Sequence, residues 1–514
     1  MLVLGLVDIP FWAQLIILFV AMIVAYIVYM TWEYDIFKKM GVDGPKPTMV
    51  IGNMGMFMSE GIVKAERDLY IKYGKIFGTF EAKYPNLFIG DPELLKEILV
   101  KDFNSFVNRR DFDQMDDPLR DSLLTLKDDH WRFVRNVITP TFSGKKLRAM
   151  GPLIRQAGDL LLANLEEKAV KGEDTSLKVT FGAYTMDIIA RTAFGLEVNS
   201  QRDPNDPFIK HVKVFSDSKV AAVLGIIYLF FPFMNWIPRA IQTAGINLTK
   251  DATDFFISVT EKALKDRRQN PGRYADFLEL MAHAQAAKEE NTKSEGVSAN
   301  SWSSRNMLSD SEIRSQALLF FLAGYDTTSN SLTFVFYHLA IHPDICDKVI
   351  QEIDDNLGKE PADYDNIKKL TYLEMVIEET SRIFPAASRI DRIASRDVVI
   401  GNVKIPKGMI VTMPIGAIQM DPKYWPDPDK FDPERFTAEA KANRDPYTYL
   451  PFGAGPRSCI GIRLALMEQK MCIAQVLQSF RPVRSARTDC PPKISKLGNM
   501  VTDEGLWIKF EKRS

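Results

Sequence analysis

The sequence predicts a mainly α-helical protein with a small β-rich region and one N-terminal transmembrane helix. Three observations lead to this fold class. No residue between Ile9 and Trp32 is charged, apolar patterns with helix start and stop signals fill most of the remaining chain, and the segments that alternate like strands are short. A length of 514 residues would fit roughly three domains of about 150 residues, but a single large α-rich unit fits it equally well.

The N-terminal apolar segment is predicted to anchor the chain in a membrane. The 24 residues from Ile9 to Trp32 correspond to about 36 Å of helix, which exceeds the ~30 Å of a hydrocarbon core. No Lys or Arg precedes them, so the basic start of a cleavable signal is missing. Because Asp8 precedes and Lys38 and Lys39 follow, the N-terminus is expected in the lumen and the body in the cytoplasm. We predict an anchor over residues 1–33, with a buried core helix as the weaker alternative.

A hinge is predicted between the anchor and the body of the protein. Residues 34–52 contain Gly41-Val-Asp-Gly-Pro-Lys-Pro47, whose glycines and prolines favour a stiff turn. We expect residues 53–514 to form a single domain, since no internal repeat is evident.

Composition restricts the classes of function. A net charge of −1 with 25% charged residues gives no overall basic bias toward nucleic acid. The four cysteines, Cys346, Cys459, Cys472 and Cys490, show no paired spacing, so we expect no disulfide framework and a reducing, cytosol-facing body.

Strand and helix signals follow one another in the body. We predict short strands over 76–80 and 87–89, a helix that begins at Asp91, a polar linker over 288–310, a helix over 373–383, hairpins over 398–405 and 494–510, and a helix over 463–478. A long helix is predicted from Ser309 or Asp310 to about His342, where Pro343 stops it. His338 and His342 stand four residues apart on it, but no glutamate follows the first, so a core or helix-end position is favoured over zinc.

The segment over 220–238 is apolar for most of its length. Gly225 and Pro232 interrupt it and argue against a second membrane span. A buried helical hairpin is one interpretation, and a resemblance to the segment that roofs the substrate cavity in a known family gives the other.

The stretch from Pro451 to Ile462 carries the strongest chemical signal. It places Cys459 after a glycine-rich loop and directly before a predicted helix, where unpaired backbone N–H groups favour a negative charge. The glycines let a large flat group approach the backbone, and Arg457 supplies a cation close by. A haem with propionates fits both needs. The alternative is a buried, inert cysteine in a tight turn.

Five residues of this stretch match a known signature. Phe452, Gly455, Arg457, Cys459 and Gly461 stand as in the haem-binding signature Phe-x-x-Gly-x-Arg-x-Cys-x-Gly of the cytochromes P-450, so the chain resembles a haem-thiolate protein. The resemblance covers the whole chain, with the anchor, the hinge and the motifs below in the order of the family. It implies the family's triangular helical body, with haem between the long helix and the helix after Cys459. The sequence around Trp131, Ala323 and Phe452 looks most like the animal drug- and steroid-oxidising third family.

Further arginines are expected at the haem propionates. Trp131 and Arg135 lie four residues apart, so an indole donor and a guanidinium can point at the same acceptor. In the family this Trp-x-x-x-Arg pattern bonds a propionate, and Arg109, or its neighbour Arg110, matches an arginine with a similar role. Arg392 is expected to pair with a propionate as well. Together the resemblance assigns haem binding to Cys459, Arg457, Phe452, Gly453, Gly461, Trp131, Arg135, Arg109, Arg392 and Ala323, with Cys459 as the axial ligand of the iron.

The middle of the long helix reads Ala323-Gly-Tyr-Asp-Thr-Thr328. Glycine and hydroxyl residues in an apolar helix predict a local bulge that holds water. Asp326 beside Thr327 combines a carboxyl with a hydroxyl group, a pair that can deliver protons through ordered water. The segment resembles the family's oxygen-activating motif, so Asp326 and Thr327 are expected to be catalytic. Thromboxane synthase, a relative that isomerises a peroxide, lacks the first threonine of this motif. This chain has that residue, Thr327, which favours oxygen activation. The alternative is a helix kink with self-satisfied threonines.

Other positions are expected to be structural or to touch substrate. Glu379, Arg382 and Arg435 resemble the family's Glu-x-x-Arg and later arginine, which lock the core. Ala387, Ser388 and Met500 are expected at the substrate. The basic residues Arg132, Lys145, Lys146 and Arg148 form either a docking site for an acidic electron donor or a solvated face.

The resemblance implies a monooxygenase that inserts one atom of dioxygen into a lipophilic substrate. It implies haem b as cofactor, electrons from NADPH through a partner flavoprotein, the NADPH-cytochrome P-450 reductase, and cytochrome b5 as a further donor. The implied location is the endoplasmic reticulum membrane. The alternatives are a haem-thiolate isomerase or dehydratase that acts on a peroxide without a reductase, and a haem-binding carrier or sensor without turnover.

Overall fold

The computed structural model describes residues 10–110, 119–203, 205–216, 230, 249–270, 272, 276–281, 308–496 and 505–513. Their α-helices are α1 (Phe11–Thr31), α2 (Ile36–Met40), α3 (Met54–Glu60), α4 (Ile62–Tyr73), α5 (Pro92–Lys96), α6 (Asp128–Ile138), α7 (Gly144–Lys171), α8 (Leu177–Phe194), α9 (Pro207–Ser216), α12 (Lys250–Gln269), α14 (Asp310–Ile341), α15 (Pro343–Asn356), α16 (Thr371–Ile383), α17 (Ile415–Ile418), α18 (Ala438–Asn443) and α19 (Ile462–Ser479). The strands are β1 (Ile76–Glu81), β2 (Tyr84–Ile89), β3 (Thr175–Ser176), β4 (Ile390–Ile393), β5 (Val398–Ile400), β6 (Val403–Ile405), β7 (Ile410–Met413), β8 (Phe480–Arg484) and β9 (Trp507–Lys512). The predicted class, mainly helical with a small β-rich region, is confirmed.

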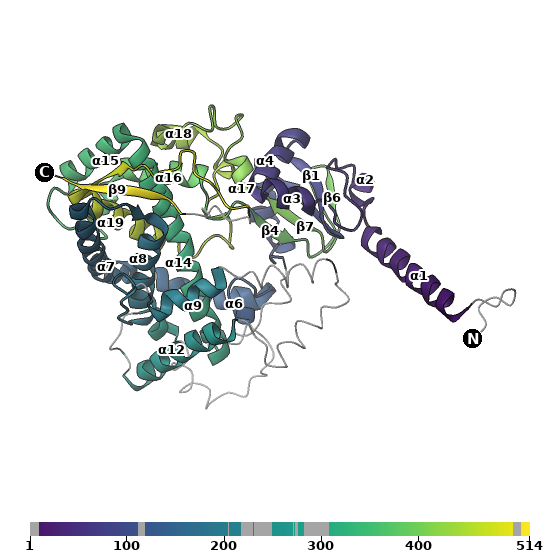
Figure 1. The fold of residues 1–514 in the computed structure, drawn as a ribbon, viewed down its shortest axis with the longest axis horizontal. Coiled ribbons are helices and arrows are strands. Elements are labelled where there is room, and N and C mark those ends of the chain that lie inside the picture. The colour runs from purple at the N-terminus through teal and green to yellow at the C-terminus, as the bar shows by residue number, and fades with distance from the viewer. Residues whose placement is uncertain are drawn as a thin grey trace.

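Helix α1 projects from the body beside the β-rich region (Figure 1). With α2 it forms a helical stretch from Phe11 to Met40, and within the described residues it is the one helix long and apolar enough to cross a membrane. Its apolar side chains are largely exposed, from Phe11 to Tyr29. An apolar helix that buries almost nothing in the protein needs another apolar surrounding, which supports the predicted anchor.

The β-rich region is a four-stranded sheet in the order β1-β2-β7-β4. β1 and β2 are the strands predicted over 76–80 and 87–89, and they pair antiparallel. β4 pairs antiparallel with β7, which itself runs parallel to β2. The hairpin predicted over 398–405 is β5 paired with β6. This sheet carries β4, and β4 contributes Arg392 to the site described below.

The hairpin predicted over 494–510, with its turn at Asp503, can be compared with the structure only in part, because residues 497–504 lie outside the described residues. β9 lies between β3 and β8, and it pairs with both. The predicted turn at Asp503 lies outside the described residues, as do Met500 and almost all of the apolar segment over 220–238.

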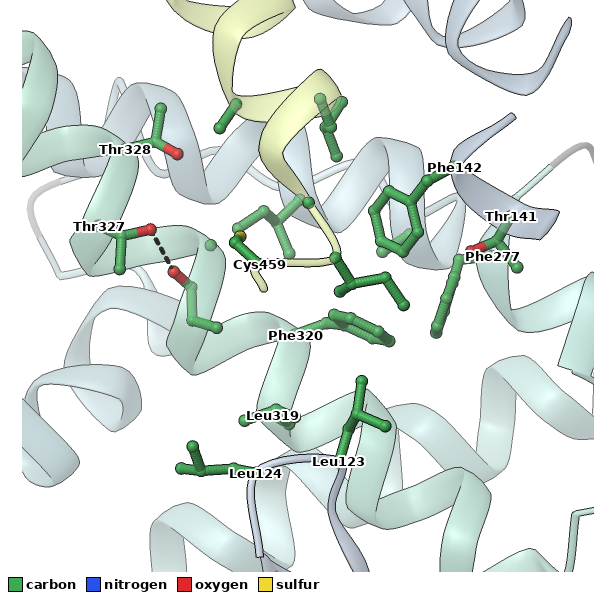
Figure 2. A pocket seen from close by; sticks show the side chains of 18 of the residues that line it. Leu123, Leu124, Thr141, Phe142, Phe277, Leu319, Phe320, Thr327, Thr328 and Cys459 are labelled. Carbon is green, nitrogen blue, oxygen red and sulfur yellow. Dashed lines mark hydrogen bonds between the residues drawn. The ribbon is translucent and has the colours of Figure 1, made fainter. Parts of the chain in front are cut away.

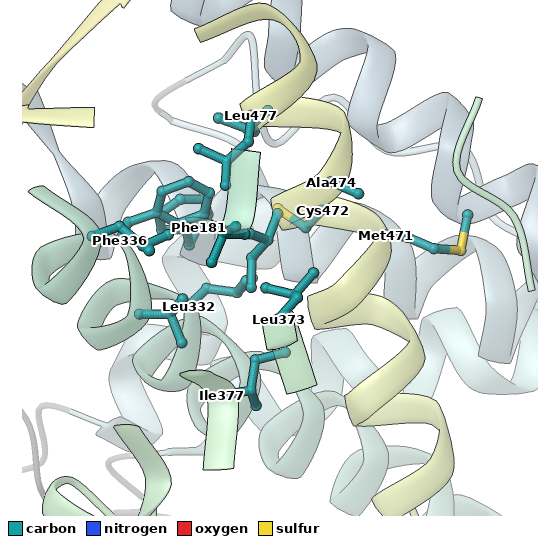
Figure 3. Packing of buried hydrophobic residues seen from close by; sticks show 14 of the residues in the cluster. Phe181, Leu332, Phe336, Leu373, Ile377, Met471, Cys472, Ala474 and Leu477 are labelled. Atoms are coloured by element: carbon teal, nitrogen blue, oxygen red, sulfur yellow. The ribbon is translucent and has the colours of Figure 1, made fainter. Parts of the chain in front are cut away.

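Helix α14 is the long central helix that the sequence predicts. Ser309 begins it with a capping box, in which its hydroxyl accepts from Glu312 N at 3.2 Å and Glu312 Oε2 accepts from Ser309 N at 2.6 Å. Pro343 follows its end and starts α15. α14 packs on α8, α16 and α19 (Figure 1). Figure 3 shows the core on one side of it, where Phe181 stacks on Phe336 at 4.7 Å.

A buried ion pair within α16 also bonds to the segment that precedes the cysteine loop, the stretch from Pro451 to Ile462. Arg382 Nε lies 2.7 Å from Glu379 Oε2, and both side chains are fully buried. The backbone N–H of Asp432 donates to Glu379 at 2.9 Å, and Arg435 Nε lies 3.5 Å from the same carboxylate. Arg382 also donates to the carbonyls of Gln419 and Pro428. A buried pair is tolerated only when such bonds satisfy it, so these contacts agree with the structural role expected for the three residues.

His338 and His342 occupy a core position and a helix end. The ring of His338 stacks on Phe431 at 4.0 Å with an interplanar angle of 5°, and His342 follows the last residue of α14. Both ring nitrogens of His338 lack a hydrogen-bond partner among the described residues. Burial, reinforced by His342 and Arg382, lowers the pKa of His338 well below its usual value.

We expect His338→Leu to make folding less sensitive to mild acid. In the unfolded chain the histidine takes up a proton as pH falls through about 6.5, whereas the buried ring does not, so protonation favours unfolding. Stability of the natural protein is therefore full above that pH and falls below it. Thermal melts from pH 7.5 to 5 should show a shallower decline for His338→Leu, while His342→Asn should decline like the natural protein. Parallel declines in all three proteins would contradict the assignment.

Candidate active site

One cavity lies between α14 and the cysteine loop, with a volume of about 260 Å³. Its walls come from α6, α8, α14 and α19 and from the segments around Arg109, Leu123 and Phe277. Figure 2 shows Cys459 on one side and Phe320 of α14 facing it, with Phe142 and Phe277 beside them. The apolar lining residues are Leu123, Leu124, Phe142, Met150, Ile189, Ala193, Phe277, Leu319, Phe320, Ala323, Ile460, Leu464 and Ala465. Most of the wall is thus apolar, and the polar groups are few.

Cys459 opens into this cavity at the start of α19. Its backbone N–H donates to the Phe452 carbonyl at 2.9 Å, which closes the loop. Burial raises the pKa of the Cys459 thiol above its usual value, while the Gly461 N–H, Arg135, Arg109 and the Ile462 N–H lower it. The predicted helix N-terminus is therefore present, but desolvation outweighs it for the bare thiol.

The glycines of the loop have different roles. Gly455 has φ +72°, and a Cβ there would lie 1.9 Å from the Leu99 carbonyl oxygen. Gly453 has φ +69°, and a Cβ there would make only ordinary contacts, with Ile390 Cδ1 at 3.7 Å and Ser458 Cα at 4.0 Å. Gly461 has φ −90° as the residue before α19, so its backbone does not demand glycine. It lines the cavity instead, where a missing side chain leaves room.

Four arginines converge on the cavity. Arg109, Arg135 and Arg457 line it, and Arg392 lies beside Arg109 and Arg457, almost fully buried. Nε of Arg109, of Arg392 and of Arg457, and Nη1 of Arg457, have no partner among the described residues. Burial together with Arg109 and Arg392 lowers the pKa of Arg457 to about 8, and burial with Arg109 lowers that of Arg392 to about 9. Clustered buried cations with free N–H groups fit a ligand with carboxylates.

Helix α6 presents the Trp-x-x-x-Arg pair as predicted. Trp131 and Arg135 lie one turn apart and both line the cavity. Arg457 lies over the Trp131 ring at 4.4 Å and donates to the Leu126 carbonyl. Of the two arginines between which the sequence left a choice, Arg109 lines the cavity, while Arg110 pairs with Glu81.

The basic cluster faces outward. Arg148 makes two 2.9 Å hydrogen bonds to Asp365 on the surface, and Arg132 donates to Asn104. Lys145 is exposed and Lys146 half-buried. These contacts allow both interpretations given above.

The side chain of Thr327 faces the cavity, whereas that of Asp326 faces α8. Thr327 lines the cavity, and its hydroxyl donates to the Ala323 carbonyl at 2.7 Å, the dashed line in Figure 2. Asp326 is not part of the described cavity wall, and its carboxylate pairs with Lys178 of α8 at 2.7 Å. The predicted bulge is wrong for this structure, since α14 stays α-helical through these residues and the threonine hydroxyl bonds back within the helix.

Gly324 has a packing reason that the sequence did not reveal. A Cβ there would lie 2.1 Å from Ile189 Cδ1 of α8. The glycine thus lets α8 approach α14 at the cavity, and Ala323 beside it lines the wall.

Of the remaining predicted residues, the structure places only Phe452 beside a cavity. Phe452 borders a second cavity of about 30 Å³, which it shares with Thr327 and Thr328. Neither Ala387, which is exposed, nor Ser388, which is buried, lines the two cavities as described. Met500 lies outside the described residues.

Glu468 lines the cavity and was missed by the sequence analysis. It is buried on α19, its Oε1 has no partner among the described residues, and burial raises its pKa well above the usual value. A signal was present, because Gly461, Leu464, Ala465 and Glu468 follow helical spacing on one face. Phe277 gave no such signal, since tertiary packing alone brings it to the cavity.

Comparison with known proteins gives one consistent answer. The family model for cytochrome P-450 matches residues 42–510. The chain is 38% identical over 500 residues to cytochrome P-450 3A25 of Mus musculus, with 97% of this chain and 96% of that protein covered. It is 38% identical over 509 residues to cytochrome P-450 3A6 of Oryctolagus cuniculus, with 98% of each covered. It is 37% identical over 501 residues to cytochrome P-450 3A5 of Homo sapiens, with 97% and 96% covered.

We expect Gly455→Ala to destabilise the cysteine loop more than a change of backbone preference explains. A left-handed φ costs a non-glycine residue about 1–3 kcal/mol, and here the new Cβ also meets the Leu99 carbonyl. Gly408→Ala is the matched control, because Gly408 has φ +85° with nothing within 4 Å. Thermal unfolding should show a larger loss for Gly455→Ala. Equal losses in the two variants would rule out the clash.

Proposed function

Because this chain belongs to the cytochrome P-450 family, we propose that it oxidises a lipophilic small molecule with electrons that a separate NADPH-dependent flavoprotein reductase delivers. The protein is a haem-dependent monooxygenase, and haem b is its cofactor. The observation that carries the proposal is a cysteine thiol and four arginines around one largely apolar cavity.

The residues of the cavity fit haem b. Cys459 would be the axial ligand of the iron. The free N–H groups of Arg109, Arg392 and Arg457, with Arg135 and the Trp131 indole, would hold the two propionates. Ala323, Phe452, Gly453 and Gly461 would border the flat faces and edges. Bound through a thiolate, haem supplies the redox chemistry that activates dioxygen.

The apolar wall would select the substrate and exclude water. Phe142, Phe277 and Phe320 lie in mutual contact, with ring centroids 4.1 to 6.1 Å apart. Such a surface favours apolar and aromatic compounds over charged ones. Steroids, fatty acids and apolar xenobiotics share that character. Ala387, Ser388 and Met500 are proposed to complete the substrate contacts.

Thr327 and Asp326 would manage protons on the two sides of α14. The Thr327 hydroxyl stands in the cavity wall, where it can hold a water molecule in place of its bond to Ala323. Asp326 is about one third exposed and is held by Lys178. It can therefore exchange protons with solvent, and it must release Lys178 before it reaches a water beside Thr327. This places proton uptake and proton delivery on adjacent residues.

We also propose how the protein is arranged at its membrane. Residues 1–33 would anchor it in the endoplasmic reticulum membrane with the N-terminus in the lumen, and residues 34–52 would be a hinge. Residues 53–514 would form a single cytoplasmic haem-thiolate domain. The basic residues Arg132, Lys145, Lys146 and Arg148 would face an acidic electron donor, either the reductase or cytochrome b5. The surface placement of this cluster supports that role.

We expect Cys459→Ala to lose the thiolate-ligated haem spectrum. The purified variant, reduced under carbon monoxide, should lack the absorption band of the natural protein, because no sulfur would remain to bind the iron. Cys472→Ala is the control, since Cys472 is buried on the same helix away from the cavity. A thiolate spectrum that persists in Cys459→Ala would refute the ligand assignment.

Thr327→Ala should uncouple electron use from product formation. Without the hydroxyl, protons reach the cavity without control, so NADPH consumption should continue while the yield of product per NADPH falls by about tenfold or more. The assay measures NADPH, dioxygen, hydrogen peroxide and product with the reductase present. Thr333→Ala is the control, because that hydroxyl bonds within α14 away from the cavity. Unchanged coupling would contradict the role of Thr327, and product formed from a peroxide without NADPH would indicate an isomerase instead.

A further inference from the structure

A network of buried charges lies behind the arginines of the cavity. It consists of Glu66 of α4, Glu81 of β1, and the arginines Arg110 and Arg389, and Asp391 of β4 adjoins it. Glu66 is 2% exposed, the side chains of Glu81 and Arg110 are 13% and 14% exposed, and Arg389 at the edge of the network is 32% exposed. None of these residues lines the described cavity, so the mechanism above gives them no role.

Two carboxylates hold the two arginines of this network. Arg389 Nη1 lies 3.0 Å from Glu66 Oε1 and 3.6 Å from Glu81 Oε1. Arg110 pairs with the other oxygen of Glu81. Asn86 donates to Glu81 at 3.3 Å and itself accepts from Thr412 at 2.7 Å, which ties the carboxylate to β2 and β7. Glu81 therefore has a fixed position in the sheet.

Hydrogen bonds of the backbone hold residues 108–110 against β4. Ile393 N donates to the Asn108 carbonyl at 2.8 Å, and Arg110 N donates to Asp391 Oδ1 at 3.3 Å. In extended chains neighbouring side chains point to opposite sides. Arg110 pairs with Glu81 on the network side, while its neighbour Arg109 lines the cavity. In the same way Asp391 on the network side leaves Arg392 on the cavity side.

The charges of the surrounding groups favour Arg110 on the network side and Arg109 on the cavity side. Although burial opposes it, Arg110 and Arg389 hold the pKa of Glu81 below its usual value, so Glu81 is ionised in the folded protein. Burial lowers the pKa of both Arg109 and Arg392, and the Asp391 carboxylate acts in the opposite direction on both. Without Glu81 the side chain of Arg110 would lose the ion pair that holds it on the network side.

We propose that Glu81 is a positioning residue for the cofactor, which holds Arg110 away from the cavity and thereby fixes Arg109 and Arg392 toward the haem propionates. Glu66 supports it through Arg389. This inference rests on the proposed role of Arg109 and Arg392 in haem binding. It adds to that role a cause for the direction in which the two side chains point.

Glu81→Gln is the direct test, in the full-length, haem-loaded protein. Groups that orient the ligands of a metal or cofactor typically change affinity by 10–100-fold when removed. We expect haem transfer to an excess of apo-globin to be about tenfold faster for Glu81→Gln, and the reduction potential of the haem to shift as the propionates lose their fixed partners. Glu66→Gln should show the same changes to a smaller extent. Glu81→Asp, with its charge but a shorter reach, should fall between Glu81→Gln and the natural protein.

Asp276→Asn is the matched control. Asp276 forms a buried pair with Arg267 of α12 at 2.6 Å, with both side chains 5% exposed or less, and neither lines the cavity. It should lower the melting temperature without faster haem transfer. If Glu81→Gln releases haem no faster than Asp276→Asn, the proposal is overturned. Should Glu81→Gln fail to fold, Glu81→Asp decides by the same comparison.

Arg109→Gln separates this inference from the function on which it rests. Faster haem transfer in Arg109→Gln with none in the Glu81 variants would leave the propionate site intact and reject only the positioning role. Unchanged transfer in Arg109→Gln would reject the propionate site itself.

Discussion

Four guanidinium groups around one buried cavity set a condition that the surrounding structure must meet. Burial and mutual repulsion lower the pKa of Arg392 and Arg457, and several of their N–H groups have no partner in the described protein. Cations in such a position cost stability unless an anion accepts from them. A dianionic cofactor bound among them would remove this cost and would join segments that are far apart in the sequence. Haem binding and the stability of this region are therefore coupled.

Small residues and strand alternation make that arrangement possible. Gly324 lets α8 approach α14, and Gly455 lets the cysteine loop pass the Leu99 carbonyl. Hydrogen bonds join residues 108–110 to β4. Arg110 and Asp391 lie on one side of this pair of segments, and Arg109 and Arg392 lie on the other. Helices α14 and α19 supply the rigid walls. The small sheet, which looks peripheral in Figure 1, thus orients two of the four arginines.

Local signals account for what the sequence predicted well. The capping box at Ser309, the proline at 343 and the apolar N-terminal run lie within single elements, and their positions agree with the structure to within one or two residues. The cysteine loop could also be predicted, since its glycines, Arg457 and Cys459 are contiguous. Contacts between elements could not. Arg109 lines the cavity while Arg110 pairs with Glu81 of β1, and Asp326 pairs with Lys178 of α8. These contacts join elements that are far apart in the sequence and leave no local signal. Residues such as Phe277 reach the cavity by packing alone.

The state of Cys459 follows from the same balance of burial and charge. Desolvation keeps the bare thiol protonated, although two backbone N–H groups and two arginines act in the opposite direction. A metal ion adds a charge at bonding distance, and a coordinating thiol then loses its proton. The helix N-terminus need not create the thiolate by itself. Its N–H groups are already directed at the sulfur. They would moderate the charge of a thiolate bound to iron, and hydrogen bonds to a ligating sulfur are one means by which a protein sets the potential of such a centre.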